Sequence, residues 1–149
     1  YNKMVMISAC LAGKKCRYDG GAKPNAEILA RIAGGEEFCL VCPECMGGLP
    51  IPREPAEIQG GTGADVLAGR ARVISRDGKD VTAAYLAGAQ KGLQMAKAKG
   101  ADTVLLKSKS PSCGAGRIHD GSFSGRLVPG NGVFAELLMQ NGIRVLEME

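Results

Sequence analysis

The stretch VTAAYLAGAQKGLQMAKAKGADTVLL, residues 81–106, decides the fold class. Over residues 81–99, apolar side chains recur at helical spacing: Leu86, Ala89, Leu93 and Ala96. Gly100 then stops the helical pattern, as glycine commonly does at the end of a helix. The TVLL run at 103–106 is typical of a strand that is buried on both faces of a parallel sheet. A helix that leads into such a strand is the repeating unit of an α/β domain.

The same alternation extends outward through the rest of the chain. We expect further strands at 5–8, 37–41, 71–75 and 143–146, and further helices at 26–33 and 132–140. Between them, residues 46–63 and 107–130 are rich in glycine, proline and polar residues, and we expect loops there. We find no repeat or linker. The sequence therefore predicts one α/β domain over residues 1–149, a three-layer Rossmann-like arrangement with a mainly parallel sheet.

Composition excludes several classes of function. The net charge of +4 is modest and scattered, and the chain has no Trp and three Phe, so we expect neither duplex nor single-stranded nucleic acid as a partner. No apolar run reaches membrane-spanning length, and Val5–Ile7 is too short for a signal peptide. Tyr1–Lys3 is consistent with added residues ahead of a native Met4, although a removed leader is the alternative. The sequence does not indicate an oligomeric state.

Six cysteines in 149 residues need an explanation. A disulfide framework is typical of secreted proteins with small cores, whereas this chain is long enough to bury a substantial aliphatic core. We therefore expect a cytoplasmic protein whose thiols stay reduced and serve a metal or catalysis.

Cys10, Cys42 and Cys113 share one position, because each follows a predicted strand. Ligands of open parallel sheets collect outside the carboxyl ends of the strands, so the three thiols are expected to meet there. The surrounding segments 8–13 and 110–116 consist of small residues and serines, whose N–H and O–H groups stabilise anionic sulfur. Since three thiolates need compensating positive charge, the pattern indicates a metal centre.

The other cysteines allow rival interpretations. Cys39 lies inside a predicted strand and is interpreted as a small buried hydrophobe, while Cys16 is a fourth ligand, a reactive thiol or neither. Cys39, Cys42 and Cys45 form a C-x2-C-x2-C run like that of bacterial ferredoxins, but without a fourth cysteine at ferredoxin spacing. Structural zinc, and a metal-free enzyme with Cys16 or Cys113 as nucleophile, are further alternatives.

Three segments together resemble the thiouracil desulfurase (TudS) family, formerly a domain of unknown function. They are SACLAGKKCRYDGGAKPN (8–25), VCPECMGGLPIPREPAEI (41–58) and KSKSPSCGAGRIHDGSFSG (107–125). The resemblance continues through DGKDVTAAYLAGA (77–89) and NGVFAELLMQNGI (131–143), so it covers essentially the whole chain.

The resemblance implies a [4Fe–4S] cluster held by Cys10, Cys42 and Cys113, with one iron not bound by protein. It implies Glu44 and Ser110 as catalytic residues. The implied reaction is a non-redox desulfuration of a thiolated pyrimidine, similar to 2-thiouracil, that releases sulfide and the oxo-pyrimidine. The alternative function is a non-catalytic iron–sulfur or zinc-binding protein that acts as a redox sensor or binding module.

Several roles near these residues stay open. Glu44 either relays protons or only pairs with Arg53. Arg17 and Asp19 are candidates for binding the pyrimidine edge, but they precede two glycines and would equally well build a turn. Ser112 either contacts substrate or hydrogen-bonds a cluster sulfur. His119, the only histidine, is expected in a polar loop or short strand with an incidental role.

Overall fold

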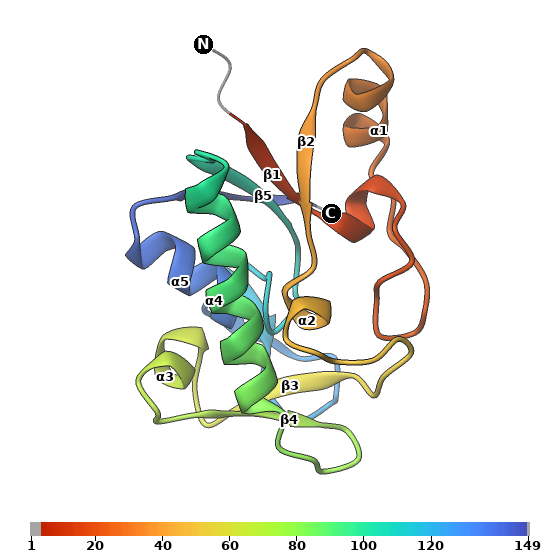
Figure 1. Cartoon of the computed structure of the whole chain (residues 1–149). Coiled ribbons are helices and arrows are strands. Elements are labelled where there is room, and N and C mark those ends of the chain that lie inside the picture. Colours follow the sequence, from red (N-terminus) through yellow and green to blue (C-terminus); the bar gives the residue numbers. More distant parts are fainter. Residues whose placement is uncertain (1–3, 149) are drawn as a thin grey trace.

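The computed structural model describes residues 4–148, so the expectation for Tyr1–Lys3 lies outside the described part. A four-stranded sheet crosses the molecule in the order β2-β1-β5-β8, and all neighbouring pairs in it are parallel. The strands are β1 (Val5–Ser8), β2 (Phe38–Val41), β5 (Thr103–Lys107) and β8 (Arg144–Met148), as Figure 1 shows. The predicted α/β fold with a mainly parallel sheet is confirmed.

Helices lie on both faces of the sheet and make three layers. Successive strand residues point to opposite faces, and Met6 and Ile7 of β1 therefore enter different cores. Met6 belongs to the large core with the residues of α4 (Thr82–Ala98) and α5 (Val133–Gln140). Ile7 packs on the other face with Ile28 of α1 (Ala26–Ala33). Within residues 4–148, no helix is both long and apolar enough to cross a membrane.

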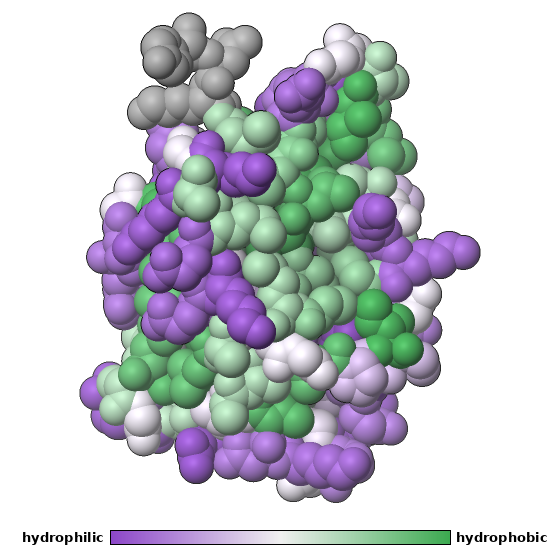
Figure 2. Space-filling model, viewed as in Figure 1, coloured by the Kyte–Doolittle hydropathy of each residue, from purple (hydrophilic) through white to green (hydrophobic). Residues whose placement is uncertain are grey.

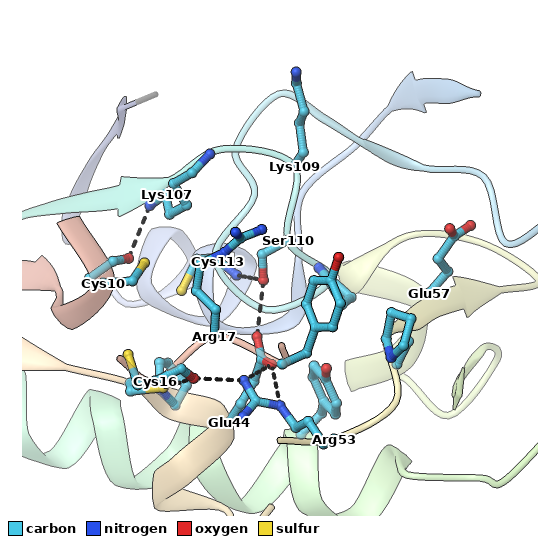
Figure 3. Close-up of a pocket in the computed structure, with 18 of the residues that line it drawn as sticks. Cys10, Cys16, Arg17, Glu44, Arg53, Glu57, Lys107, Lys109, Ser110 and Cys113 are labelled. Carbon is cyan, nitrogen blue, oxygen red and sulfur yellow. Dashed lines mark hydrogen bonds and ion pairs between the residues drawn. The ribbon is translucent and has the colours of Figure 1, made fainter. Parts of the chain in front are cut away.

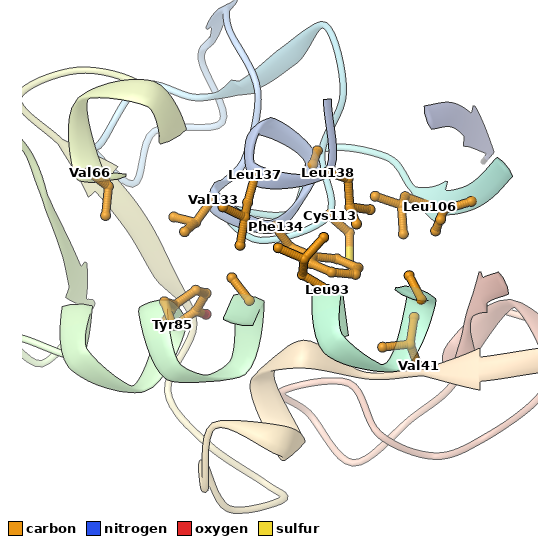
Figure 4. Packing of buried hydrophobic residues seen from close by; sticks show 14 of the residues in the cluster. Val41, Val66, Tyr85, Leu93, Leu106, Cys113, Val133, Phe134, Leu137 and Leu138 are labelled. Atoms are coloured by element: carbon orange, nitrogen blue, oxygen red, sulfur yellow. The ribbon is translucent and has the colours of Figure 1, made fainter. Parts of the chain in front are cut away.

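The large core is aliphatic apart from two aromatic rings. Phe134 of α5 is completely buried, and Tyr85 of α4 is almost so. Figure 4 shows the Phe134 ring between Leu93 and the side chains of the strands, with Cys113 at the edge of the same core. Burying a ring of this size contributes about 1.5–3 kcal/mol to stability. Cys113 is thus anchored in the large core.

One expected strand lies outside the central sheet. β4 (Arg72–Ser75) pairs antiparallel with β3 (Ala56–Gln59) in a separate two-stranded sheet, and β3 occupies part of the predicted loop 46–63. The pair forms because Ile58 and Val73 face each other in register and are both buried, which covers one end of the large core. A short helix, α3 (Gly63–Leu67), follows β3 and was not expected.

One further expectation needs correction, and one is confirmed with less burial than its apolar face suggests. The predicted loop 107–130 contains a small hairpin of β6 (Arg117–His119) and β7 (Leu127–Pro129), held to the core by the buried Ile118. The helix at 26–33 exists, but only Ile28 of its apolar face is buried. Leu29 and Ile32 are 42% and 39% exposed, and Figure 2 shows apolar surface in this region.

Candidate active site

The three strand-end cysteines come from neighbouring strands. β1 runs directly into a 3-10 turn, η1 (Ala9–Ala12), which carries Cys10. β2 ends at Val41, and Cys42 follows it directly as the N-cap residue of the short helix α2 (Pro43–Met46). Cys113 lies in the loop after β5. Because β2, β1 and β5 are adjacent and parallel, the three loops meet at one edge of the sheet (Figure 1).

A cavity of about 390 Å³ opens at this edge. Cys10, Cys42 and Cys113 all line it, and Cys16 does so as well. Figure 3 shows the Cys10, Cys16 and Cys113 sulfurs around the same space. Cys39 does not line the cavity and packs against the large core instead, in agreement with its interpretation as a small hydrophobe.

Three of the four thiols that line the cavity have a raised pKa. Burial raises the pKa of Cys113 to about 12. The hydrogen bond with Cys16 raises the pKa of Cys42, and the hydrogen bond with Cys10 raises the pKa of Cys16 to about 11. Of these four thiols, only Cys10 has a lowered pKa, because Cys16 hydrogen-bonds it. The raised values disfavour Cys16 or Cys113 as a metal-free nucleophile, since the thiolate is the reactive form.

The donor set fits an iron–sulfur cluster. Ser8 and Ser112 hydroxyls both lower the pKa of Cys113, so hydrogen-bond donors already face that sulfur. Ser112 Oγ is buried and has no other partner among residues 4–148, which leaves it available to an anionic cofactor sulfur. Across the same residues, no three His, Cys, Asp or Glu side chains converge on one point.

Glu44 lies beside the cysteines on α2, where an ion pair fixes it. Its Oε2 accepts hydrogen bonds from Arg53 Nη2 at 2.6 Å and from Arg53 Nε at 3.1 Å. The Arg53 side chain is 7% exposed and also donates from Nη2 to the Cys16 carbonyl at 3.1 Å. Tyr85 adds a hydrogen bond to the same carboxylate, and this contact and burial raise the pKa of Tyr85. Figure 3 shows Arg53 and Glu44 joined below Ser110.

Ser110 completes the network from the opposite loop. Its Oγ donates to Glu44 Oε1 at 3.2 Å, so Arg53 and Ser110 hold the two carboxylate oxygens separately. The same Oγ accepts the N–H groups of Ser112 at 3.0 Å and Cys113 at 3.1 Å. Ser110 therefore shapes the turn that delivers Cys113 and also contacts the acidic residue of the site.

The loop that carries Cys113 is held by the first turn of α5. The N–H of Val133 donates to the Pro111 carbonyl at 2.8 Å, and the N–H of Phe134 donates to the Ser112 carbonyl at 3.0 Å. These N–H groups have no partner inside the helix, so the loop satisfies them. Lys109, with φ of 70°, turns the chain between β5 and Ser110.

Of the three candidate substrate-binding residues, one lines the cavity and two do not. Arg17 lines the cavity. Asp19 does not line it, and its Oδ1 accepts the Gly21 N–H at 2.8 Å, which is the turn-building role. Ser112 does not line the cavity either and is buried behind it. Direct contact of Asp19 or Ser112 with a ligand in the cavity is therefore not supported.

Other residues of the cavity were missed or undervalued in the sequence. Tyr85 and Glu57 line it, and so does His119, which had been expected to be incidental. His119 Nδ1 is buried and has no hydrogen-bond partner among residues 4–148. Glu57 accepts the N–H groups of Gly121 and Phe123, so it fixes the loop after β6. The polar residue types in 107–125 pointed to the loop that carries His119, whereas nothing in the sequence singled out Tyr85 or Glu57.

Comparisons with known proteins agree with this site. A family model described as 2-thiouracil desulfurase matches residues 5–149. The protein YbbK of Bacillus subtilis (strain 168) is 47% identical over 143 residues, which cover 96% of this chain and 94% of YbbK. A solved structure described as the [4Fe-4S]-dependent thiouracil desulfidase TudS is 40% identical, with a TM-score of 0.84, over 98% of this chain and 91% of its own. The chain therefore belongs to the 2-thiouracil desulfurase family.

Proposed function

We propose that the protein removes sulfur from a thiolated pyrimidine such as 2-thiouracil. One thiocarbonyl and one water give one carbonyl and one hydrogen sulfide, so the reaction balances without an oxidant or reductant. The observation that carries the proposal is the position of the Glu44–Ser110 pair, in the same cavity as Cys10, Cys42 and Cys113. An acid–base pair beside a thiolate donor set is what a hydrolytic exchange of sulfur for oxygen requires.

Cys10, Cys42 and Cys113 would hold a [4Fe–4S] cluster with one iron left without a protein ligand. The cluster, when bound, supplies a soft Lewis acid that binds the thiocarbonyl sulfur and polarises its bond to carbon. The three thiols support this assignment because they come from adjacent strand ends and line one cavity. Cys39 lies outside this cavity, which argues against a C-x2-C-x2-C ligand set.

Glu44 would act as the proton acceptor and donor. Arg53 holds Oε2 at 2.6 Å, whereas Oε1 accepts from the Ser110 hydroxyl at 3.2 Å, so Oε1 is the oxygen that would exchange protons. Glu44 Oε1 would take a proton from the attacking water and return it to the leaving sulfur or a ring nitrogen. Ser110 would orient the substrate or pass the proton through its hydroxyl.

The cavity suits a small heterocycle. Its volume of about 390 Å³ is at the lower end for ligand pockets, and apolar, basic and hydroxyl groups share its lining. Arg17 would stabilise negative charge that develops on the ring as water adds. All six cysteines are free, which supports a reducing compartment such as the cytoplasm as the place of work.

The test is an anaerobic reconstitution. The full chain is loaded with iron and sulfide, both are counted, and 2-thiouracil is added while released sulfide and uracil are measured. We expect about four irons per chain and equal amounts of the two products. A loaded cluster with no turnover on any thiolated pyrimidine would favour the non-catalytic iron–sulfur alternative. Stoichiometric zinc in place of iron, with no activity, would favour the zinc-binding alternative.

A further inference from the structure

We infer that Cys42 and Cys45 are the two partners of a reversible disulfide in the cluster-free protein. The Sγ atoms of the two residues are in contact at 3.3 Å, so a small movement brings them to the about 2.05 Å of a disulfide bond. The residues are three apart, Cys42 just before α2 and Cys45 within it, so one helical turn places both thiols on the same side. The Cys-x-x-Cys spacing is also that of many redox-active pairs.

The neighbouring thiol of Cys16 is a poorer partner for Cys42. Cys16 is shared, because its thiol hydrogen-bonds both Cys10 and Cys42. Its carbonyl is held by Arg53 at 3.1 Å, and the Cys42 and Cys45 thiols both approach this carbonyl at 3.9 Å. A bond between Cys16 and Cys42 would have to join two separate loops. A bond between Cys42 and Cys45 closes within a single turn, where little backbone movement is needed.

The chemistry needs a mild two-electron oxidant, and a hydroperoxide is the one we name. Cys42 lines the cavity, so a small peroxide reaches its sulfur. The Cys42 thiol reacts with one peroxide oxygen, which gives a sulfenic acid and releases an alcohol or water. The Cys45 sulfur then displaces the hydroxyl as a second water, and the disulfide forms. Two thiols lose two electrons and two protons, and the peroxide accepts all of them.

The disulfide has two consequences for Cys42. It stops further oxidation of Cys42 to a sulfinic acid, which thiol reductants do not reverse. It also removes one of the three cysteines that would bind the cluster, and this second consequence rests on the proposed function. Cluster-free protein would accordingly remain in the disulfide form, which binds iron and sulfide only after the disulfide is reduced.

Peptide mapping tests the disulfide without reference to the cluster. The full chain without cluster is treated with hydrogen peroxide, remaining thiols are alkylated, and the protein is cut with trypsin and a glutamate-specific protease. Cleavage after Glu44 separates fragment 38–44 from fragment 45–53. We expect these two fragments to remain linked until a reductant is added. Cys42 linked to Cys16, or oxidised beyond the sulfenic acid with Cys45 reduced, would overturn the inference.

Two variants identify which cysteine of fragment 38–44 is linked to Cys45. Fragment 38–44 also contains Cys39, so the Cys39→Ser variant must keep the link. In Cys45→Ser the link must be absent, and Cys42 is expected to reach the sulfinic acid at the same peroxide dose. If Cys39→Ser loses the link, the partner of Cys45 is Cys39 and the inference fails.

The loaded protein separates this inference from the proposed function. Bound cluster is expected to suppress the link at the same peroxide dose, because Cys42 is then a ligand. If the link forms equally fast in the loaded protein, Cys42 is not a ligand and the proposed function needs revision, while the disulfide stands. Iron uptake by the oxidised protein is expected to fall sharply and to recover after reduction with dithiothreitol.

Discussion

Gly88 of α4 lies directly against the carbonyl of Pro43, the first residue of α2. A Cβ atom at position 88 would be 1.9 Å from the Pro43 carbonyl oxygen. Gly47, at the end of α2, makes the reciprocal approach, since a Cβ there would be 2.0 Å from the Ala84 carbonyl oxygen. The two helices cross backbone to backbone. Because α2 carries Glu44, this crossing sets the position of the carboxylate in the site.

The Gly88→Ala variant is expected to destabilise the protein and to lower activity. The added methyl group meets a backbone carbonyl that cannot move unless α2 moves, and overpacking of this kind costs about 1–3 kcal/mol. The gain in helix propensity on replacing Gly by Ala, about 1 kcal/mol, offsets only part of that cost. Chemical denaturation measures the change in the free energy of unfolding.

Ala87→Gly is the matched control for Gly88→Ala. Ala87 is exposed on the same helix, so the change to Gly measures the propensity effect at a neighbouring position without a new contact. Adding the loss measured for Ala87→Gly to the change measured for Gly88→Ala isolates the clash with Pro43. If the isolated effect is near zero, α2 and α4 are farther apart than described.

Glu44→Gln is expected to lower kcat by about 100-fold or more, as loss of a general acid–base residue does. Glutamine keeps an oxygen that can accept from Arg53, but it cannot take a proton from water. Initial rates of sulfide release by cluster-loaded protein measure the effect, with the iron content determined in parallel. Glu27→Gln, an exposed change on α1, is the control. Full activity of Glu44→Gln with a normal cluster would mean that the Arg53 ion pair is its whole role.

Ser110→Ala and Ser112→Ala are expected to differ. Ser110 Oγ accepts two N–H groups and donates to Glu44, so its removal leaves buried donors unsatisfied, which costs about 1–3 kcal/mol. Activity should fall with it. Among residues 4–148, Ser112 Oγ has no hydrogen-bond partner except the Cys113 sulfur, so Ser112→Ala should leave unfolding nearly unchanged. Thermal unfolding measures the stability of both variants, and sulfide release measures their activity. Equal losses of stability and activity in Ser110→Ala and Ser112→Ala would contradict the separate roles.

The sequence predicted the central sheet because its strands are short, continuous apolar runs. Strand ends then brought Cys10, Cys42 and Cys113 to one edge, and the order β2-β1-β5 made this grouping possible. The order of the strands in the sheet could not be predicted from the sequence alone. It depends on which helix covers which face of the sheet.

The features that the sequence did not predict depend on contacts between distant parts of the chain. β3 contains a single fully buried side chain, Ile58, and becomes a strand only by pairing with β4. The helix at 26–33 could be predicted from the sequence, but not that Ile28 alone of α1 would be buried against the sheet. Asp19 and Ser112 were candidate ligands by residue type, and only the cavity lining distinguishes them from Arg17.

Tyr85 shows most clearly what periodicity cannot reveal, because its spacing on α4 is that of a core residue. Its ring is buried in the large core, but its hydroxyl hydrogen-bonds the Glu44 carboxylate. Tyr85→Phe keeps the ring and removes this contact. A hydrogen bond to a charged group is worth about 1.5–3 kcal/mol, so we expect kcat to fall about tenfold or more while KM changes little. Steady-state kinetics of the loaded variant, with thermal unfolding as the check on folding, test this. An unchanged kcat would mean that Arg53 and Ser110 orient Glu44 without Tyr85.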